Sequence, residues 1–135
     1  MSHALVIEHE AVYPHSPERV WRALVDPAEL AQWLMPTDFA PEVGREFVLE
    51  TGSEEVGTIH AEVLELDAPR LLRCRWSGGF GDTEVTFELF PEGAGTRLRV
   101  RHDGWSEPLP AEHAGFDDGW KQKLDEELPR LFATD

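Results

Sequence analysis

The pattern of apolar and polar residues predicts six short strands in this sequence. Five of them follow one another after Gly44, with glycine and proline residues between them at intervals of about ten residues. Strands at this spacing favour an antiparallel meander, in which each strand pairs with the next. The predicted strands are residues 4–12, 46–51, 57–66, 71–77, 83–90 and 96–102.

Strict alternation in the last two strands indicates that the sheet has one buried and one solvent-facing side. Apolar residues take every second position, with Glu or Thr between them in one strand and Arg in the other. Same-face residues of a hairpin are neighbours, so we expect the glutamates to lie beside the arginines on the solvent side. The predicted buried face holds Phe47, Leu49, Leu72, Cys74, Trp76, Val85, Phe87, Leu89, Leu98, Val100 and His102.

The strand at residues 57–66 does not keep one alternation. Ile59, Ala61 and Val63 favour one face, whereas Leu64 and Leu66 favour the other. We therefore expect a bulge or bend between these two groups.

A single long helix is predicted for residues 111–132, where apolar residues recur every three or four positions. Such a helix would be about 33 Å long, as long as a strand of ten residues, so it can cover the buried face of the sheet. Pro129 removes a helical hydrogen bond and predicts a bend, or a last turn that begins there. The recurring apolar residues are Phe116, Trp120, Leu124, Leu128 and Leu131.

Two short helices are predicted between residues 17 and 36. Asp26 and Pro27 divide them, since Asp is a good cap and Pro suits the first turn of a helix. Trp21 and Trp33 are expected to anchor the pair in the core.

Composition and charge exclude some classes of partner. The chain of 135 residues, with 41% apolar residues, fits a single domain, residues 1–135, with a core of its own. A net charge of −15 argues against nucleic acid and against anionic membranes, which need basic surfaces. No apolar run is long enough for membrane insertion, and the N-terminus lacks the order of a secretory signal, so a cytoplasmic protein is expected. The lone Cys74 agrees with that compartment.

Several motifs, taken in order, carry a family resemblance: "SPERVWRALVDPAELAQWL", "AEVLELDAPRLL", "TEVTFEL", "GTRLRVRHDGW" and a late "GW" before the amphipathic helix. Together they resemble the activator-of-heat-shock-protein-90-ATPase-like branch of the START-related, helix-grip (SRPBCC) superfamily. The resemblance implies an α+β fold in which a curved antiparallel sheet of about six or seven strands grips a long C-terminal helix. The two short helices after the first strand would close one end of the sheet.

The resemblance also implies a cavity between the sheet and the long helix. The first functional hypothesis is a binding module for a small apolar or amphipathic molecule that is lipid-, sterol- or polyketide-like. The second is an enzyme of the aromatase/cyclase kind, and the third is a module that stimulates a chaperone ATPase. Alternatively, large side chains fill the space completely. The expected cavity residues are Phe47, Leu49, Val63, Trp76, Phe87, Leu98, Val100, His102, Phe116, Trp120 and Leu124.

Candidate chemistry is sparse, so a binding protein is favoured over an enzyme and no catalytic residue is assigned. His102 either orients a ligand or acts as a base, or it is a hydrogen-bonded histidine at the rim of the sheet. His60 and His113 are expected to face solvent. The histidines show no metal-ligand spacing, and no cofactor is expected. Trp105, in the segment 103–110, either gates the cavity or pins that segment onto the body.

Overall fold

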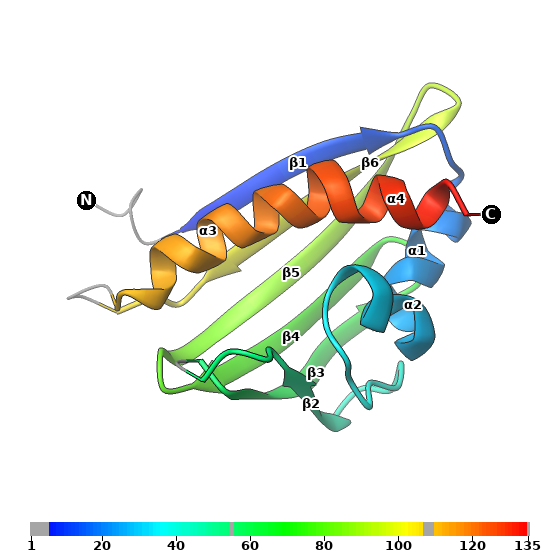
Figure 1. The fold of residues 1–135 in the computed structure, drawn as a ribbon. Coiled ribbons are helices and arrows are strands. Elements are labelled where there is room, and N and C mark those ends of the chain that lie inside the picture. The colour runs from blue at the N-terminus through cyan, green and yellow to red at the C-terminus, as the bar shows by residue number, and fades with distance from the viewer. Residues whose placement is uncertain (1–5, 55, 107–109, 135) are drawn as a thin grey trace.

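The predicted strands form one antiparallel sheet in the computed structural model, which describes residues 6–54, 56–106 and 110–134 (Figure 1). The spatial order is β1-β6-β5-β4-β3-β2, so five strands form the predicted meander and the first strand pairs with the last. The alternating segments therefore predicted the strands and the pairing of the last five, whereas the pairing of the first strand with the last was not predicted. The strands are β1 (Ile7–Tyr13), β2 (Glu46–Glu50), β3 (Thr58–Asp67), β4 (Leu71–Gly78), β5 (Gly81–Glu92) and β6 (Gly95–Asp103).

The two faces of the sheet separate by charge as predicted. Glu88 lies directly opposite Arg99, and their side chains meet at 2.7 Å. Arg73 reaches Glu84, which lies diagonally across from it on β5, at 2.8 Å. Such exposed pairs contribute little stability each, about 0–1 kcal/mol, but they keep this face in water.

The bulge expected in the third strand is present. The register between β3 and β4 shifts between Val63 and Glu65. His60 lies before the shift and is exposed, as predicted.

The turn between β4 and β5 differs from the prediction. Gly78 pairs with Gly81, so the turn consists of Gly79 and Phe80, and β5 begins earlier than residue 83. Phe80 is buried, with its ring centroid 5.0 Å from that of Phe116. Burial of an aromatic ring accounts for this tighter turn, because Phe80 adds apolar area to the core.

Two short helices, α1 (Pro17–Val25) and α2 (Pro27–Trp33), close one end of the curved sheet (Figure 1). Asp26 caps the second helix by accepting a hydrogen bond from the Ala28 N–H at 3.0 Å. Trp33 is buried and donates from its indole to the carbonyl of Ala23 at 2.7 Å. Trp21 is only partly buried, at the edge of the core.

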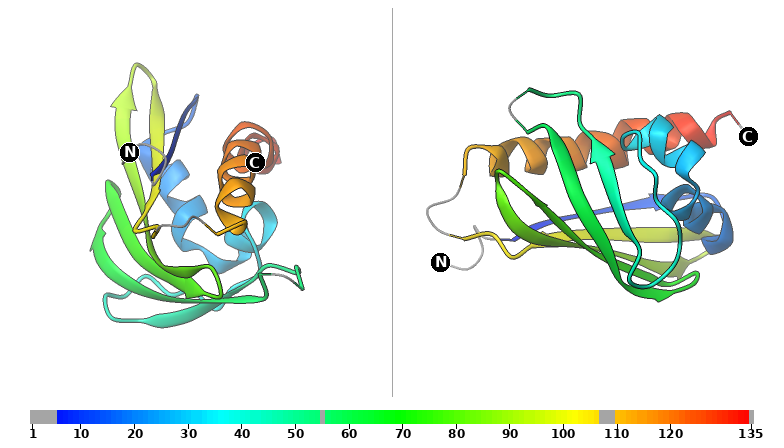
Figure 2. Two further views of the ribbon diagram at one scale, coloured as in Figure 1. Left: turned by 90° about the vertical axis from the view of Figure 1, so that its left-hand side faces the viewer. Right: turned by 90° about the horizontal axis from the view of Figure 1, so that it is seen from below.

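The C-terminal helix lies along the concave side of the sheet (Figures 1 and 2) and has three parts. These are α3 (Glu112–Gln122), a π-helical turn η2 (Lys123–Glu127) and α4 (Leu128–Phe132). The last turn was expected to begin at Pro129, and α4 begins one residue earlier.

The π-turn compensates for the proline. The Leu128 N–H donates to the carbonyl of Lys123, five residues back. The Leu124 carbonyl would then need the N–H of Pro129, which does not exist. Instead it accepts from the hydroxyl of Tyr13 at 2.6 Å. Burial, together with the nearby Asp125, raises the pKa of Tyr13, so the hydroxyl stays protonated as this donor.

Candidate functional site

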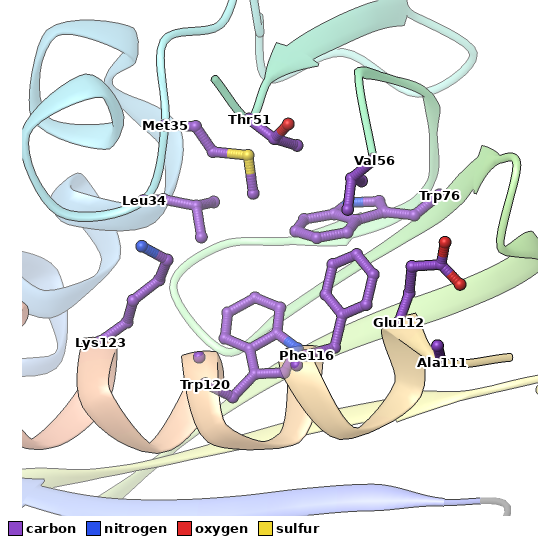
Figure 3. A pocket seen from close by; sticks show the side chains of 12 residues that line it. Leu34, Met35, Thr51, Val56, Trp76, Ala111, Glu112, Phe116, Trp120 and Lys123 are labelled. Carbon is purple, nitrogen blue, oxygen red and sulfur yellow. The ribbon is translucent and has the colours of Figure 1, made fainter. Parts of the chain in front are cut away.

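A pocket of about 360 Å³, partly open to solvent, lies beside the first half of the C-terminal helix (Figure 3). One wall is the helix, and the opposite wall comes from the end of α2, the loop after β2 and the strand β4. Its volume is at the low end of the range for small-molecule sites. The residues opposite the helix are Leu34, Met35, Thr51, Val56 and Trp76.

The helix wall is hollow at two positions that carry no side chain. Gly115 and Gly119 are one turn apart and both line the pocket, with Ala111 one turn earlier. A Cβ atom added at either glycine would meet nothing within 4 Å. Glycine inside a helix costs about 1 kcal/mol relative to alanine. Glycine at these two positions therefore lowers the stability of the helix but leaves open space beside it.

Three aromatic side chains form the floor of the pocket. The ring centroids of Trp76 and Trp120 are 5.5 Å apart, and those of Trp76 and Phe116 are 6.4 Å apart. Figure 3 shows these rings gathered between the helix and the strand. Aromatic residues therefore fill part of the space under the helix, but not the part beside the glycines.

His102 lies beneath this floor and does not line the pocket. The Trp120 indole N–H donates to Nδ1 of His102 at 3.1 Å, which requires that nitrogen to be unprotonated. The proton is then on Nε2, 2.8 Å from the hydroxyl oxygen of Thr83, and the Thr83 hydroxyl donates to the Trp76 carbonyl. Burial, with a smaller contribution from His113, lowers the pKa of His102 to about 3. The histidine is neutral, and both its ring nitrogens are engaged.

Trp105 is buried, and its indole donates to the His102 carbonyl at 3.2 Å. Of the two roles considered, this contact favours the one in which Trp105 pins the segment after β6. Residues 107–109 of that segment lie outside the described residues.

His113 differs from the expectation that it faces solvent. Its ring packs against that of Trp105, with centroids 5.0 Å apart, and its Nε2 is buried without a hydrogen-bond partner in the described chain. The His113 ring, in the first turn of α3, is therefore directed toward Trp105 rather than toward solvent.

Two charged side chains stand at opposite ends of the pocket. Glu112 is in the first turn of α3, and Lys123 is eleven residues later, about 16 Å along the helix axis. In Figure 3 the Lys123 side chain extends from the helix toward Leu34. Burial lowers the pKa of Lys123, and the nearby Glu127 partly opposes this shift.

Of the cavity residues expected from the sequence, Trp76, Phe116 and Trp120 line the pocket. The other eight are buried in the core and are not among the residues around the pocket. They are Phe47, Leu49, Val63, Phe87, Leu98, Val100, His102 and Leu124.

Sequence reasoning missed the two glycines, Lys123 and the wall formed by Leu34 and Met35. A signal for the glycines was available, because two glycines four residues apart in an amphipathic helix indicate a face that needs room. The wall of Leu34 and Met35 comes from tertiary packing and has no such local signal.

No three His, Cys, Asp or Glu side chains in the described ranges come together as a metal site would require. In the same ranges, no helix has the length and apolar character needed to cross a membrane.

A curved sheet that holds a long helix, with a pocket between them, defines the helix-grip class of α+β proteins. The sequence also matches the family described as Activator of Hsp90 ATPase homolog 1-like protein over residues 14–133. The chain therefore belongs to this family, and the expected resemblance is confirmed.

Solved structures agree with this assignment. Protein MLL2253 from Mesorhizobium loti is 30% identical, with a TM-score of 0.87 over 96% of this chain and 97% of that one. DynU16, a protein in the dynemicin biosynthetic locus, is 23% identical, with a TM-score of 0.77 over 94% of this chain and 45% of that one. PFC0360w, an HSP90 activator from Plasmodium falciparum, is 19% identical, with a TM-score of 0.79 over 96% of each. The last two likenesses show the fold alone. No curated protein matches the chain.

Proposed function

We propose that this protein binds a small apolar or amphipathic molecule in the pocket beside α3. The observation that carries the proposal is the unfilled space next to Gly115 and Gly119, over a floor of three aromatic rings. A mostly apolar pocket with a few polar groups at its ends is the common form of a small-molecule site.

The geometry also supports a static site with an open side. Trp105, for which gating was one of two roles considered, donates to the His102 carbonyl. A ligand would therefore enter past the loop after β2 or past Met35. Leu34, Met35 and Val56 would then contact the ligand directly.

Filling the pocket provides the main test. In Gly119→Leu the new side chain projects into the space where a Cβ meets nothing. Leucine is the better helix former by about 0.8 kcal/mol, so this variant is expected to fold at least as well as the wild type. Native mass spectrometry of freshly purified protein should show a bound small molecule in the wild type and none in Gly119→Leu.

Ala114→Leu is the matched control, because Ala114 is exposed on the same helix and does not line the pocket. It should retain the ligand. If fluorescent apolar probes bind Gly119→Leu as tightly as the wild type, the pocket is not the binding site and the proposal fails.

A second candidate is the stimulation of a chaperone ATPase. The family match favours it. The ATPase rate of a heat-shock chaperone, measured with and without this protein, tests it directly. A rate that rises equally with the wild type and with Gly119→Leu would assign that activity to the surface rather than to the pocket.

A further inference from the structure

Lys123 is unusual among the cations of this acidic protein. Ten of the twelve Lys and Arg side chains have a carboxylate within 4.0 Å, as expected when 27 acidic residues surround them. Within the described residues, only Arg45 and Lys123 have no such partner. Arg45 is exposed to water, whereas Lys123 is partly buried against the pocket.

Glu127, the acid whose charge acts on Lys123, does not form an ion pair with it. Glu127 lies one turn further on, but its carboxylate is 3.1 Å from Arg130 and also accepts from Gln122. An ammonium group that has lost part of its water and has no paired carboxylate is costly. An anionic group on a bound molecule would remove that cost.

The two ends of the pocket differ in charge. The walls near Lys123 are the apolar side chains of Leu34 and Met35, and the floor is aromatic (Figure 3). At the other end, Glu112 would repel an anion. A molecule with an apolar body and one acidic group would therefore fit in one orientation only.

We infer that the pocket selects apolar molecules that carry a single anionic group, such as a carboxylate, and that Lys123 is the residue that binds this group. This inference rests on the proposed function, because it assigns the ligand class of the same pocket. Lys123 acts as a specificity residue, and the aromatic floor and the glycines provide the space for the apolar body.

Two fluorescent probes of nearly equal shape separate charge from apolar binding. 1-Anilinonaphthalene-8-sulfonate is anionic, and N-phenyl-1-naphthylamine lacks the sulfonate. In Lys123→Met we expect the Kd of the anionic probe to rise at least about tenfold, which is about 1.4 kcal/mol. The Kd of the neutral probe should change less than about twofold. Lys123→Arg keeps the charge and should restore most of the affinity for the anion.

Lys121→Met is the matched control. It makes the same substitution and the same change of net charge two residues away, at a side chain that is 69% exposed and paired with Asp125. It should leave both affinities within about twofold of the wild type. Thermal unfolding of each variant shows whether it is folded.

Two outcomes would contradict the proposals, one of them the proposed function and the other only the selection of anions. If Gly119→Leu leaves the binding of both probes unchanged, the pocket is not used and the proposed function fails. If Gly119→Leu weakens both probes but Lys123→Met affects them equally or not at all, the pocket binds apolar molecules without selecting anions, and only this inference is overturned.

Discussion

In the first half of the C-terminal helix, α3, Trp120 is the one buried residue, whereas Leu124, Leu128, Leu131 and Phe132 are all buried in the second half. The second half is held against β1 and α2. The rings of Tyr13 and Phe132 meet edge to face, with centroids 5.3 Å apart, and the Tyr13 hydroxyl completes the π-turn. The first half stands beside open space (Figure 3).

This difference indicates how one helix can serve both stability and binding. The second half packs the helix against the sheet with four buried side chains, whereas the first half is attached through Trp120 and through the contact of Asp117 with His9 at 2.7 Å. The remaining face of the first half therefore does not have to contribute side chains to the packing. Glycine at positions 115 and 119 is tolerated because the helix is secured elsewhere. The candidate site therefore exists because two helix positions one turn apart, 115 and 119, carry no side chain.

The largest expected effect comes from breaking the packed half. Leu128 is fully buried, so Leu128→Ala leaves a cavity and should lower the free energy of unfolding by about 2–5 kcal/mol. Urea unfolding followed by tryptophan fluorescence measures this loss.

The comparison variant for Leu128→Ala lies on the pocket wall. Met35 is partly exposed, and its truncation to alanine should cost about 1 kcal/mol or less. Equal losses in the two variants would show that the pocket wall is packed as firmly as the second half of the helix, contrary to the comparison.

A somewhat smaller change in stability is expected from the titration of His102, which lies beneath the pocket floor. The pKa of His102 is lowered to about 3 in the folded protein, below the ordinary value of 6.5. The unfolded chain therefore takes up this proton first as the pH falls. The stability due to neutral His102 is present above pH 6.5 and is lost progressively toward pH 3. Between pH 7.5 and 4.5 the loss should be about 2–3 kcal/mol.

His102→Gln tests this assignment, since glutamine offers an acceptor to Trp120 and a donor to Thr83 but does not titrate. Between pH 7.5 and 4.5 the free energy of unfolding of His102→Gln should fall by about 2–3 kcal/mol less than that of the wild type. Parallel pH profiles for the two proteins would mean that His102 titrates normally and is not protected by its surroundings.

The sequence predicted the fold more completely than the site, for a physical reason. Strand faces follow from alternation along the chain, so the burial of His102, the exposure of His60 and the bulge near Val63 were all read correctly. These features depend on the period of a single element. The ladder of Glu and Arg residues on the outer face was predictable in the same way.

The pocket depends on which residues of different helices and strands face one another. Alternation marked Phe47, Val63 and Leu98 as inward-facing, and they are, but nothing local separates an inward residue that touches neighbours from one that borders a void. Lys123 was missed because its position in the helical period does not reveal that α2 ends opposite it. The π-turn arises from Pro129 acting together with Tyr13, which is 116 residues away in sequence.

The smallest expected effect has the opposite sign and sharpens the contrast between the halves. Gly115→Ala adds a methyl group to a helix position where it meets nothing. The substitution removes the entropic cost of glycine and should raise the free energy of unfolding by about 0.5–1 kcal/mol. Thermal unfolding by calorimetry measures the gain as a higher Tm.

Gly95→Ala is the matched substitution at a packed position. A Cβ at residue 95, where β6 begins, would collide with the backbone carbonyl oxygen of Tyr13. Because a backbone atom cannot move aside as a flexible side chain can, this variant should lose stability although it adds the same methyl group. If Gly115→Ala also lost stability, the space beside α3 would be occupied in the folded protein, and the first half of the helix would be packed like the second.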